Sequence, residues 1–266
     1  MKEQGNTKTQ SATTLASRRH ELILENLEAD GRISVSDTSR QLGVSEMTIR
    51  RDLEVLEQGG LLNRVHGGAV PARSRSYEPP FALRVMRNVD AKQRIAEAAA
   101  ALINDGETVI LDAGTTTIEI ARALRSQKDL RVLTPSLHIA TILADNPAIT
   151  LMLCGGTVRA GEQSITGALA QQAFVDFSFD TLFLTVGGVD MRSGATEYNL
   201  EDAAVKRAAF ASARRRVVVA DGSKLGKTAF ARICAVEELD LLITDASAPE
   251  KVVDGLRRTG LEILVV

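Results

Sequence analysis

Residues 45–70 read SEMTIRRDLEVLEQGGLLNRVHGGAV, and this stretch decides how the first part of the chain folds. Ser45 is a residue type that caps a helix at its N-terminus. Three apolar side chains then recur at helical spacing and form one stripe, made of Ile49, Leu53 and Leu56. Gly59-Gly60 ends the helix, and two short strands are expected over residues 61–65 and 67–70. The stretch therefore predicts a helix followed by a β-hairpin.

The residues before this stretch predict two further helices. Apolar residues recur at helical spacing between positions 15 and 28, and Asp30-Gly31 ends that helix. After a short extended piece, Ser36 is expected to cap a second helix, which Gly43 closes. Two helices joined by a tight turn containing Gly form a helix-turn-helix. With the hairpin beside it, the prediction is a winged helix-turn-helix.

The polar face of the third helix is the candidate DNA-binding surface. A single helix fits the major groove, and a hairpin beside it can grip the adjacent backbone. The helix N-terminus would direct residues 45–48 at the groove, while Arg50 and Arg51 can reach phosphates or a guanine edge. Arg64 and His66 on the hairpin are placed to contact phosphate or the minor groove. An arginine pair alone is more often solvated surface, but its combination with cap, turn and hairpin favours DNA binding.

The composition limits the class of protein. An apolar fraction of 44% and a charged fraction of 25% are typical of a soluble globular chain, and the low aromatic content of 3% predicts an aliphatic core. No apolar run approaches the roughly 20 residues of a membrane span. The polar N-terminus predicts no secretory signal. Cys154 and Cys234 stand outside any metal-binding pattern, which favours a reduced cytoplasmic protein without a metal site. Net charge is −2, so DNA binding must depend on a local face.

The texture of the sequence divides the chain into four parts. Residues 1–14 are polar and aperiodic, which predicts a disordered tail, and residues 15–71 hold the winged helix-turn-helix. Residues 72–80 are expected to be a linker. From 81 to 266 apolar runs alternate with helical patterns, which predicts an α/β part with a mostly parallel sheet covered on both faces. The expected strands are 108–111, 131–134, 150–153, 181–186, 216–220, 241–244 and 261–265. The main expected helices are 91–102, 117–124, 137–144, 201–213 and 249–256.

Turns rich in Gly, Thr and Ser follow the first four strands. Residues 112–117 read DAGTTT and can cradle a phosphate with backbone N–H groups and hydroxyls. The next three turns are expected at 134–136, 155–159 and 187–190. Arg159 could clamp an anion. Ligands of open α/β sheets bind beyond the carboxyl ends of the strands, so four such turns favour an anion pocket there. Lys224, after a fifth strand, could join the pocket or be an exposed loop lysine.

The segment GVSEMTIRRDLEVLEQGGLLNRVHGGA resembles the helix-turn-helix and wing of the DeoR family (DeoR/GlpR type) of bacterial transcriptional regulators, a match that covers about residues 16–71. The variable pair of the family pattern falls on Glu46 and Met47, which would tune operator choice. Glu46 could accept from a cytosine amino group, and Met47 could touch a thymine methyl. The expected DNA-binding residues are Ser36, Ser45, Glu46, Met47, Thr48, Arg50, Arg51, Arg64, His66, Gly67 and Gly68.

The second part of the chain resembles the effector domain of the same family in its LDAGTTT, GGTVR, GGVD, AAVKRA and DGSKLG segments. That domain is similar to ribose-5-phosphate isomerase, which implies a Rossmann-like α/β fold that senses phosphorylated sugars or related metabolites. The implied effector-binding residues are Asp112, Gly114, Thr115, Thr116, Thr117, Thr134, Ser136, Gly155, Gly156, Arg159, Gly188, Asp190, Lys206 and Lys224. Lys206 could equally be a solvated helix residue. Pro135 stands where the family commonly has Asn, so this loop offers one amide side chain fewer.

The resemblance implies a cytoplasmic repressor of a sugar or polyol catabolic operon. It would bind double-stranded operator DNA as a homodimer or homotetramer and respond to a phosphorylated sugar, with no cofactor. The alternative is a sugar-phosphate isomerase-like enzyme carrying a DNA-binding appendage. The isomerase has a glutamate base just before a lysine, and the matching position here is Val205, beside Lys206. Because valine cannot take a proton, no catalytic residue is expected.

Overall fold

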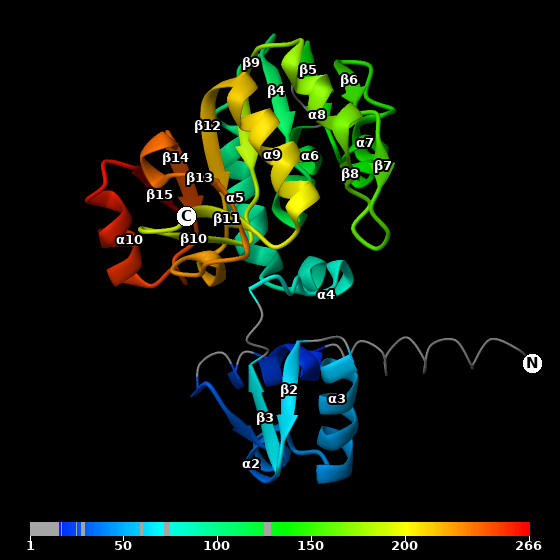
Figure 1. Cartoon of the computed structure of the whole chain (residues 1–266), viewed down its shortest axis with the longest axis vertical. Coiled ribbons are helices and arrows are strands. Elements are labelled where there is room, and N and C mark those ends of the chain that lie inside the picture. The colour runs from blue at the N-terminus through cyan, green and yellow to red at the C-terminus, as the bar shows by residue number, and fades with distance from the viewer. Residues whose placement is uncertain are drawn as a thin grey trace, which may run out of the picture. The chain divides into compact units, whose positions relative to one another are not determined.

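The computed structural model of the chain describes residues 16, 18–24, 26–27, 30–58, 61–71, 75–124 and 129–266. The chain divides into two compact units, Met1–Arg87 and Asn88–Val266 (Figure 1). The predicted disordered tail over residues 1–14 lies outside the described residues, as does the start of the predicted linker at 72–74. The predicted boundaries at residues 71 and 80 stay predictions.

The first unit is a small helical unit with a three-stranded antiparallel sheet. Residues 18–24 are helical, and the labelled elements that follow are β1 (Ile33–Ser34), α2 (Val35–Leu42), α3 (Glu46–Gln58), β2 (Leu62–Val65) and β3 (Gly68–Pro71). The sheet has the order β1-β3-β2, with β2 and β3 forming the hairpin. Gly43 ends α2 in the left-handed conformation, at φ 65°. The winged helix-turn-helix predicted from the sequence is therefore present.

The start of α2 differs from the prediction. Ser34, and not Ser36, caps this helix, because the Ser34 hydroxyl accepts from the Asp37 backbone N–H at 3.2 Å. Ser36 lies inside the first turn, where its hydroxyl is 2.9 Å from that of Ser34. The cap lies two residues before the predicted one because β1 pairs with β3 through Ser34 and Gly68. This pairing fixes the extended conformation at Ser34, so the helix begins directly after it.

The core of the first unit is aliphatic. The predicted stripe of α3 is fully buried: Ile49, Leu53 and Leu56 pack with Ile23, Leu27, Ile33, Val35, Leu62 and Ala69. Burying aliphatic side chains of this size contributes about 1.5–3 kcal/mol each relative to exposure. The stripe thus anchors α3 and fixes which of its side chains remain outside.

The second unit is built on a seven-stranded sheet whose neighbours are all parallel, as the alternation of strands and helices predicts. Its order is β15-β14-β12-β9-β4-β5-β6. The strands are β4 (Thr108–Leu111), β5 (Leu130–Thr134), β6 (Ile149–Leu153), β9 (Phe179–Leu184), β12 (Ala213–Val219), β14 (Leu241–Thr244) and β15 (Glu262–Val265). From β4 the chain builds the sheet in one direction, through β5 and β6. From β9 it builds in the other direction. The strand order therefore reverses between β4 and β9.

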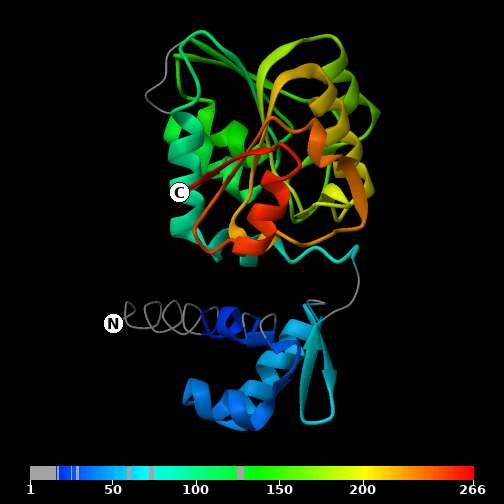
Figure 2. The same ribbon diagram turned by 90° about the vertical axis from the view of Figure 1, so that its left-hand side faces the viewer.

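Helices cover both faces of this sheet (Figure 2). They are α5 (Val89–Ala100), α6 (Thr115–Ala123), α7 (Leu137–Leu143), α8 (Ala168–Val175), α9 (Leu200–Ser212) and α10 (Glu250–Arg257). One face, packed with residues of α8 and α9, buries Ile110, Leu182, Leu184, Val218 and Leu242. Alternate residues of the same strands are also buried and point the opposite way, namely Val109, Leu111, Phe183, Val217 and Ile243. That second face is covered by α5, α6 and α7, which pack against one another.

Several elements between residues 81 and 266 were not predicted. They are helix α4 (Phe81–Met86), the hairpin of β7 (Thr157–Val158) and β8 (Ile165–Thr166), helix α8, and an antiparallel sheet of β10 (Gly188–Asp190), β11 (Gly194–Glu197) and β13 (Ala231–Cys234). The predicted turn at 187–190 is wrong in part, because Gly188–Asp190 is itself a strand. This strand pairs with β11 in antiparallel fashion, and a Cβ on Gly188 would lie 2.3 Å from the Lys227 carbonyl oxygen.

Candidate functional site

Helix α3 projects the predicted DNA-reading residues from its buried stripe. Ser45 caps the helix as predicted, since its hydroxyl accepts from the Thr48 N–H at 3.1 Å. Met47 is 59% exposed, which for a large apolar side chain leaves it free for a partner surface. Glu46 and Arg51 are exposed as well. The first two turns of α3 thus offer acidic, apolar and basic side chains on one accessible face.

Two of the predicted phosphate contacts are arginines in exposed ion pairs. Arg50 lies 3.2 Å from Glu46, one turn away on α3, and Arg64 of β2 lies 2.6 Å from Glu57. Exposed pairs of this kind contribute only about 0–1 kcal/mol. Either arginine can therefore exchange its carboxylate for a phosphate at little cost.

The tip of the wing is formed by His66 and two glycines. His66 is exposed, and Gly67 takes a left-handed conformation with φ 76°. Gly68 is buried, and a Cβ there would lie 1.9 Å from the Ile33 carbonyl oxygen. Gly67 and Gly68 therefore shape the hairpin, while His66 and Arg64 carry its accessible polar groups.

Asp52 is a buried residue of α3 that the sequence analysis missed. It accepts hydrogen bonds from Arg19 at 2.5 and 2.9 Å and lies 3.0 Å from His20 Nε2. Its position three residues after Ile49, on the apolar stripe, was the signal that could have identified it. This carboxylate ties the first helical segment to the helix that carries the exposed arginines.

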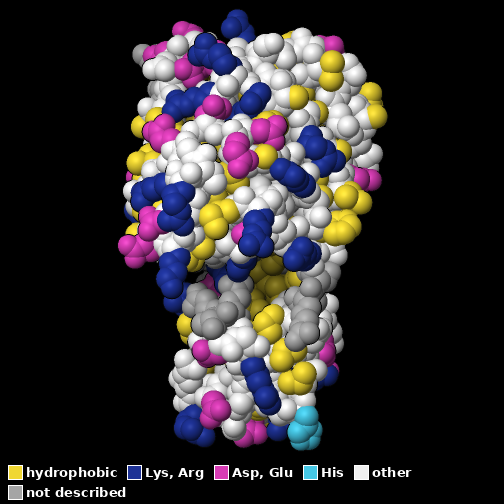
Figure 3. All heavy atoms as spheres, turned by 60° about the vertical axis from the view of Figure 1, so that its left-hand side comes forward, with side chains coloured by type: hydrophobic (Ala, Val, Ile, Leu, Met, Phe, Trp, Pro, Cys, Tyr) yellow, Lys and Arg dark blue, Asp and Glu magenta, His cyan; other side chains and the backbone are white. Residues whose placement is uncertain are grey.

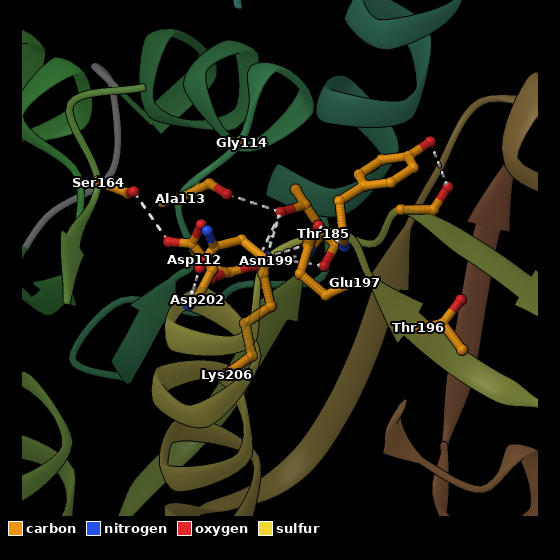
Figure 4. A network of polar contacts seen from close by, with 12 residues as sticks. Asp112, Ala113, Gly114, Ser164, Thr185, Thr196, Glu197, Asn199, Asp202 and Lys206 are labelled. Carbon is orange, nitrogen blue, oxygen red and sulfur yellow. Dashed lines mark hydrogen bonds and ion pairs between the residues drawn. The ribbon is translucent and has the colours of Figure 1, made fainter. Parts of the chain in front are cut away.

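In the second unit, Asp112 and Thr185 meet where the strand order reverses. Asp112 follows β4 and Thr185 follows β9. The Thr185 backbone N–H and hydroxyl donate to Asp112 Oδ2 at 2.9 and 2.7 Å (Figure 4). Crevices at such switch points are the usual ligand sites of open α/β sheets. Asp112, one of the predicted effector-binding residues, therefore lies at the carboxyl ends of the strands, where the sequence predicted the site.

Lys206 of α9 reaches into the same group and is not a solvated helix residue. Its ammonium pairs with Asp112, lies 3.3 Å from Glu197, and donates to the Thr185 carbonyl oxygen at 3.0 Å. Burial by itself would lower the pKa of Lys206, but the carboxylates of Asp112 and Glu197 more than offset this and raise it. Lys206 is therefore charged and neutralised from within the protein.

The N-terminus of α6 lies beside this ion cluster. Gly114 caps the helix, and a Cβ there would come within 2.5 Å of the Thr185 hydroxyl, so only glycine fits. Thr115, Thr116 and Thr117 form the first turn. The Thr117 hydroxyl donates back to the Asp112 carbonyl oxygen at 2.6 Å. The first-turn N–H groups of a helix lack intrahelical partners and attract anions.

The predicted loop at 134–136 is used to hold the backbone together. The buried Thr134 hydroxyl donates to the Leu111 carbonyl oxygen at 2.7 Å and accepts from the Ser136 N–H at 3.1 Å. Ser136 caps α7, and the Pro135 carbonyl oxygen accepts from the Ile165 N–H at 2.7 Å. This loop therefore links β5 to the β7–β8 hairpin.

The β7–β8 hairpin carries Arg159 and is fastened to α9. Gly155 and Gly156 precede it and are exposed. Arg159 forms an ion pair with Asp202 at 2.8 Å, and the Ser164 hydroxyl donates to the same carboxylate at 2.9 Å. Figure 4 shows Ser164 and Asp202 facing each other at the start of α9.

The remaining predicted residues gather around the antiparallel sheet. Asp190 accepts from the Arg192 and Ser193 N–H groups of its own turn, at 2.9 and 3.2 Å. Lys224 is half-buried, with its ammonium 5.4 Å from the centre of the Tyr198 ring. Lys224 thus contacts the ring of Tyr198, the residue that follows Glu197, whereas the hydrogen bonds of Asp190 stay within its turn.

Four residues of this region were missed by the sequence analysis: Ser164, Thr185, Glu197 and Asp202. Asp202 stands one helical turn before Lys206, a spacing that places both on the same side of α9. Thr185, which follows β9, and Glu197, which ends β11, carried no comparable signal, because the pairing of these strands cannot be predicted from local spacing.

Within the described ranges, no helix combines the length and apolar character needed to cross a bilayer. In the same residues, no cluster of His, Cys, Asp and Glu is arranged to hold a metal ion. On the face drawn in Figure 3, Lys and Arg side chains are interspersed with Asp and Glu.

Comparison with known proteins gives matches over most of the chain. Residues 19–75 match the family described as the DeoR-like helix-turn-helix domain, and residues 87–246 match the DeoR C terminal sensor domain. A putative aga operon transcriptional repressor of Escherichia coli O157:H7 is 36% identical over 95% of both chains. The transcriptional regulator GlpR of Haloferax volcanii is 37% identical, over 91% of this chain and 99% of its own. The glycerol-3-phosphate regulon repressor of Escherichia coli K12 is 31% identical, over 90% and 94%.

Among solved structures, similarity is lower. A translation initiation factor eIF-2B of Pyrococcus horikoshii aligns over 82% of this chain and 76% of its own, with a TM-score of 0.45 and 17% identity. Ribose 5-phosphate isomerase A of Methanocaldococcus jannaschii aligns over 52% and 54%, with a TM-score of 0.39 and 17% identity. Likeness at this level has no bearing on function.

Proposed function

This chain belongs to the DeoR family of transcriptional regulators, and we propose that it represses a sugar or polyol catabolic operon and is released by a phosphorylated sugar. The single observation that supports DNA binding best is the accessible face of α3. There Glu46, Met47 and Arg51 stand exposed on a helix that is anchored by a fully buried stripe. A helix held in this way can enter the major groove as a rigid body.

The proposed division of roles on DNA follows from exposure and charge. The exposed Arg51 would neutralise a phosphate of the DNA backbone. Arg50 and Arg64 would do the same once they are released from their carboxylates, and together these contacts would fix the position of the protein on the duplex. Glu46 and Met47 would contact base edges. Net charge of the whole chain is −2, so the affinity would come from this local group and would fall as salt concentration rises.

The effector part of the proposal rests on the second unit. The relatives include repressors named for the aga operon and for glycerol-3-phosphate, so a small phosphorylated metabolite is the proposed ligand class. The proposed site lies beyond the switch point of β4 and β9, where the N-terminus of α6 adjoins Asp112 and Lys206. The ligand must bind the DNA-free state more tightly than the DNA-bound state, otherwise it cannot release the operator.

The enzyme alternative has no support in the geometry or in the family. Val205, the position that resemblance aligns with the glutamate base, is buried and apolar, so it can neither take nor deliver a proton. The relatives described above, which match over nine-tenths of this chain or more, are named as a transcriptional repressor and a transcriptional regulator. A homodimer or homotetramer in the cytoplasm is part of the proposal, because helix-turn-helix proteins commonly read two half-sites about one helical turn apart.

The test is operator binding and its reversal. The full-length protein is expected to retard DNA from the promoter region beside its own gene, and a panel of sugar phosphates should contain one that releases it. Unphosphorylated sugars at the same concentration serve as the control. DNA affinity that responds to no phosphorylated compound would overturn the sensor part, and absence of any sequence-specific retardation would overturn the regulator part.

A further inference from the structure

The cations predicted to bind an anionic effector already face carboxylates of the protein itself. Lys206 pairs with Asp112 and Glu197, Arg159 pairs with Asp202, and Lys224 lies in the field of Asp221. An anionic ligand therefore enters a site whose positive charges are already neutralised by carboxylates of the protein. To bind one of these cations, it must compete with the carboxylate that holds it.

Lys206 and Arg159 differ in how easily their carboxylate partners can be replaced. The Lys206 side chain is 4% exposed, and both of its carboxylates are buried with it. Separating that cluster would leave buried charges without partners, which is strongly unfavourable. The Arg159 side chain is 23% exposed and that of Asp202 is 10% exposed, so this pair is more accessible to solvent than the Lys206 cluster. Of these two cations, Arg159 is therefore the one that an entering anion can bind more easily.

Asp202 occupies Arg159 in the way that a ligand anion would. Its carboxylate accepts from the Arg159 guanidinium at 2.8 Å and from the Ser164 hydroxyl at 2.9 Å, two donors supplied by the same hairpin. A phosphomonoester offers more oxygens and more charge than a carboxylate, and the guanidinium can bind it with two parallel hydrogen bonds. Both donors suit a phosphate group as well as they suit Asp202.

Other contacts hold Asp202 at the start of α9 when its carboxylate no longer pairs with Arg159. It lies in the first turn of α9, and its backbone N–H donates to the side chain of the capping residue Asn199 at 3.2 Å. A carboxylate is favoured at this end of a helix. One turn further along, Lys206 fixes α9 to the centre of the sheet. Asp202 can therefore release Arg159 without loss of the helix.

From these contacts we propose that Asp202 is an internal competitor for Arg159, which a phosphorylated ligand must displace before Arg159 can bind it. The inference rests on the proposed function of the second unit as a sensor of phosphorylated metabolites. Because the competing carboxylate is part of the same chain, its effective concentration is high. The apparent affinity for an anion equals the intrinsic affinity multiplied by the fraction of molecules in which Arg159 is free of Asp202.

The experiment measures binding of inorganic phosphate to the full-length protein by isothermal titration calorimetry, near neutral pH. Asp202→Asn keeps an oxygen acceptor for Ser164 but removes the nearer of the two carboxylate charges that face Arg159, at 2.8 Å, while Glu162 remains at 3.9 Å. Phosphate should bind this variant about tenfold more tightly, as expected when nine-tenths of the molecules have Arg159 occupied. Combining it with Arg159→Gln should abolish the gain. Unchanged circular dichroism would show that the variants are folded.

Glu201→Gln is the matched control. Glu201 is the neighbouring carboxylate of α9, and its contact is the Thr166 hydroxyl at 3.1 Å. The Glu201→Gln variant loses the same charge from the same helical turn but keeps the ion pair between Arg159 and Asp202. Its affinity for phosphate should therefore stay within about twofold of the wild-type value.

Three results would overturn the inference: no tightening in Asp202→Asn, equal tightening in Glu201→Gln, or a gain that survives Arg159→Gln. Failure of phosphate to bind any variant, including Asp202→Asn, would also overturn it. The proposed function is judged separately, by release of operator DNA in the wild-type protein with sugar phosphates. Operator release with no effect of Asp202→Asn would therefore leave the sensor and remove the competitor.

Discussion

Lys206 of α9 and Asp112 after β4, 94 positions apart in the chain, form an ion pair in which both side chains are almost fully buried. Glu197 faces the same ammonium at 3.3 Å, so one cation is shared by two carboxylates. A cluster of this kind stabilises the second unit only while all of its members are present. Its first role is therefore to join α9, β11 and the switch point of the sheet.

Lys206→Met is expected to lower the free energy of unfolding of the second unit by about 3–5 kcal/mol in the absence of ligand, because two carboxylates stay buried without a cation. Denaturant unfolding of the full-length protein measures this loss, and the rate of hydrogen exchange of the α9 amides shows whether it affects the second unit. Adding Asp112→Asn to this variant should recover part of the loss, since one of the unpaired charges is removed.

Lys224→Met is the comparison for this prediction. Lys224 is half-buried, and its ring contact with Tyr198 is worth about 0.5–1 kcal/mol. Asp221, whose pKa the charge of Lys224 helps to lower, keeps its hydrogen bonds from Ser223 and Asn88 in this variant, so the loss should be smaller than in Lys206→Met. Equal losses in the two lysine variants would contradict the structural role given to Lys206.

Asp52→Asn is expected to destabilise the first unit by about 2 kcal/mol. The carboxylate is 6% exposed and holds Arg19 and His20, and breaking a partly buried pair costs less than breaking one in the interior. Hydrogen exchange of the α3 amides in the full-length protein measures the loss. Glu54→Gln, an exposed change on the same helix, should stay within about 0.5 kcal/mol. Similar exchange in both variants would show that Asp52 does not hold the helix.

The contrast between Lys206 and Asp52 also shows what the sequence could predict. Local periodicity identified the apolar stripe of α3, the Ser45 cap and most strands of the parallel sheet, because each depends on neighbours a few positions away. It could not assign the partners of Lys206, which are Asp112 directly after β4 and Glu197 at the end of β11. The Ser36 cap was wrong because long-range pairing of Ser34 with Gly68 set the start of α2.

The same limit applies to the candidate effector residues. The turns after β4 and β5 were found from composition, since Gly and Thr recur there. Glu197 and Asp202, which neutralise two of the predicted cations, were missed. Sequence patterns select residue types that suit an anion, but only the fold reveals that the protein already supplies carboxylates to them.

Acid should destabilise the second unit in part through Asp221. Burial would raise the pKa of this carboxyl, but hydrogen bonds from the Ser223 N–H and Asn88, with the charge of Lys224, outweigh it and lower the pKa. A lowered pKa in the folded state gives stability that is present above the unfolded value, near 3.8, and is lost as the pH falls through the folded value.

Asp221→Asn should therefore flatten the acid limb of the stability curve. Between about pH 5 and pH 3 the urea midpoint of the wild-type protein is expected to fall more steeply than that of the variant, because only the wild type takes up a proton at this position on unfolding. The amide keeps an oxygen acceptor for Ser223, so the loop should remain folded. Parallel curves for the two proteins would contradict the prediction.

Base selection on the operator should depend on Glu46 and general affinity on Arg51. Both side chains are exposed on α3, but a carboxylate can accept from a cytosine amino group, whereas an arginine at the same surface can neutralise any phosphate. Glu46→Ala is expected to relax discrimination at one base pair by about 1–3 kcal/mol. It also frees Arg50 from its 3.2 Å ion pair, so the salt dependence of binding should not weaken.

Arg51→Ala should instead reduce affinity evenly across operator variants and lower the salt slope by about one. Titrations of single-base operator variants at several salt concentrations separate the two effects, and unchanged base preference in Glu46→Ala would remove this residue from sequence readout.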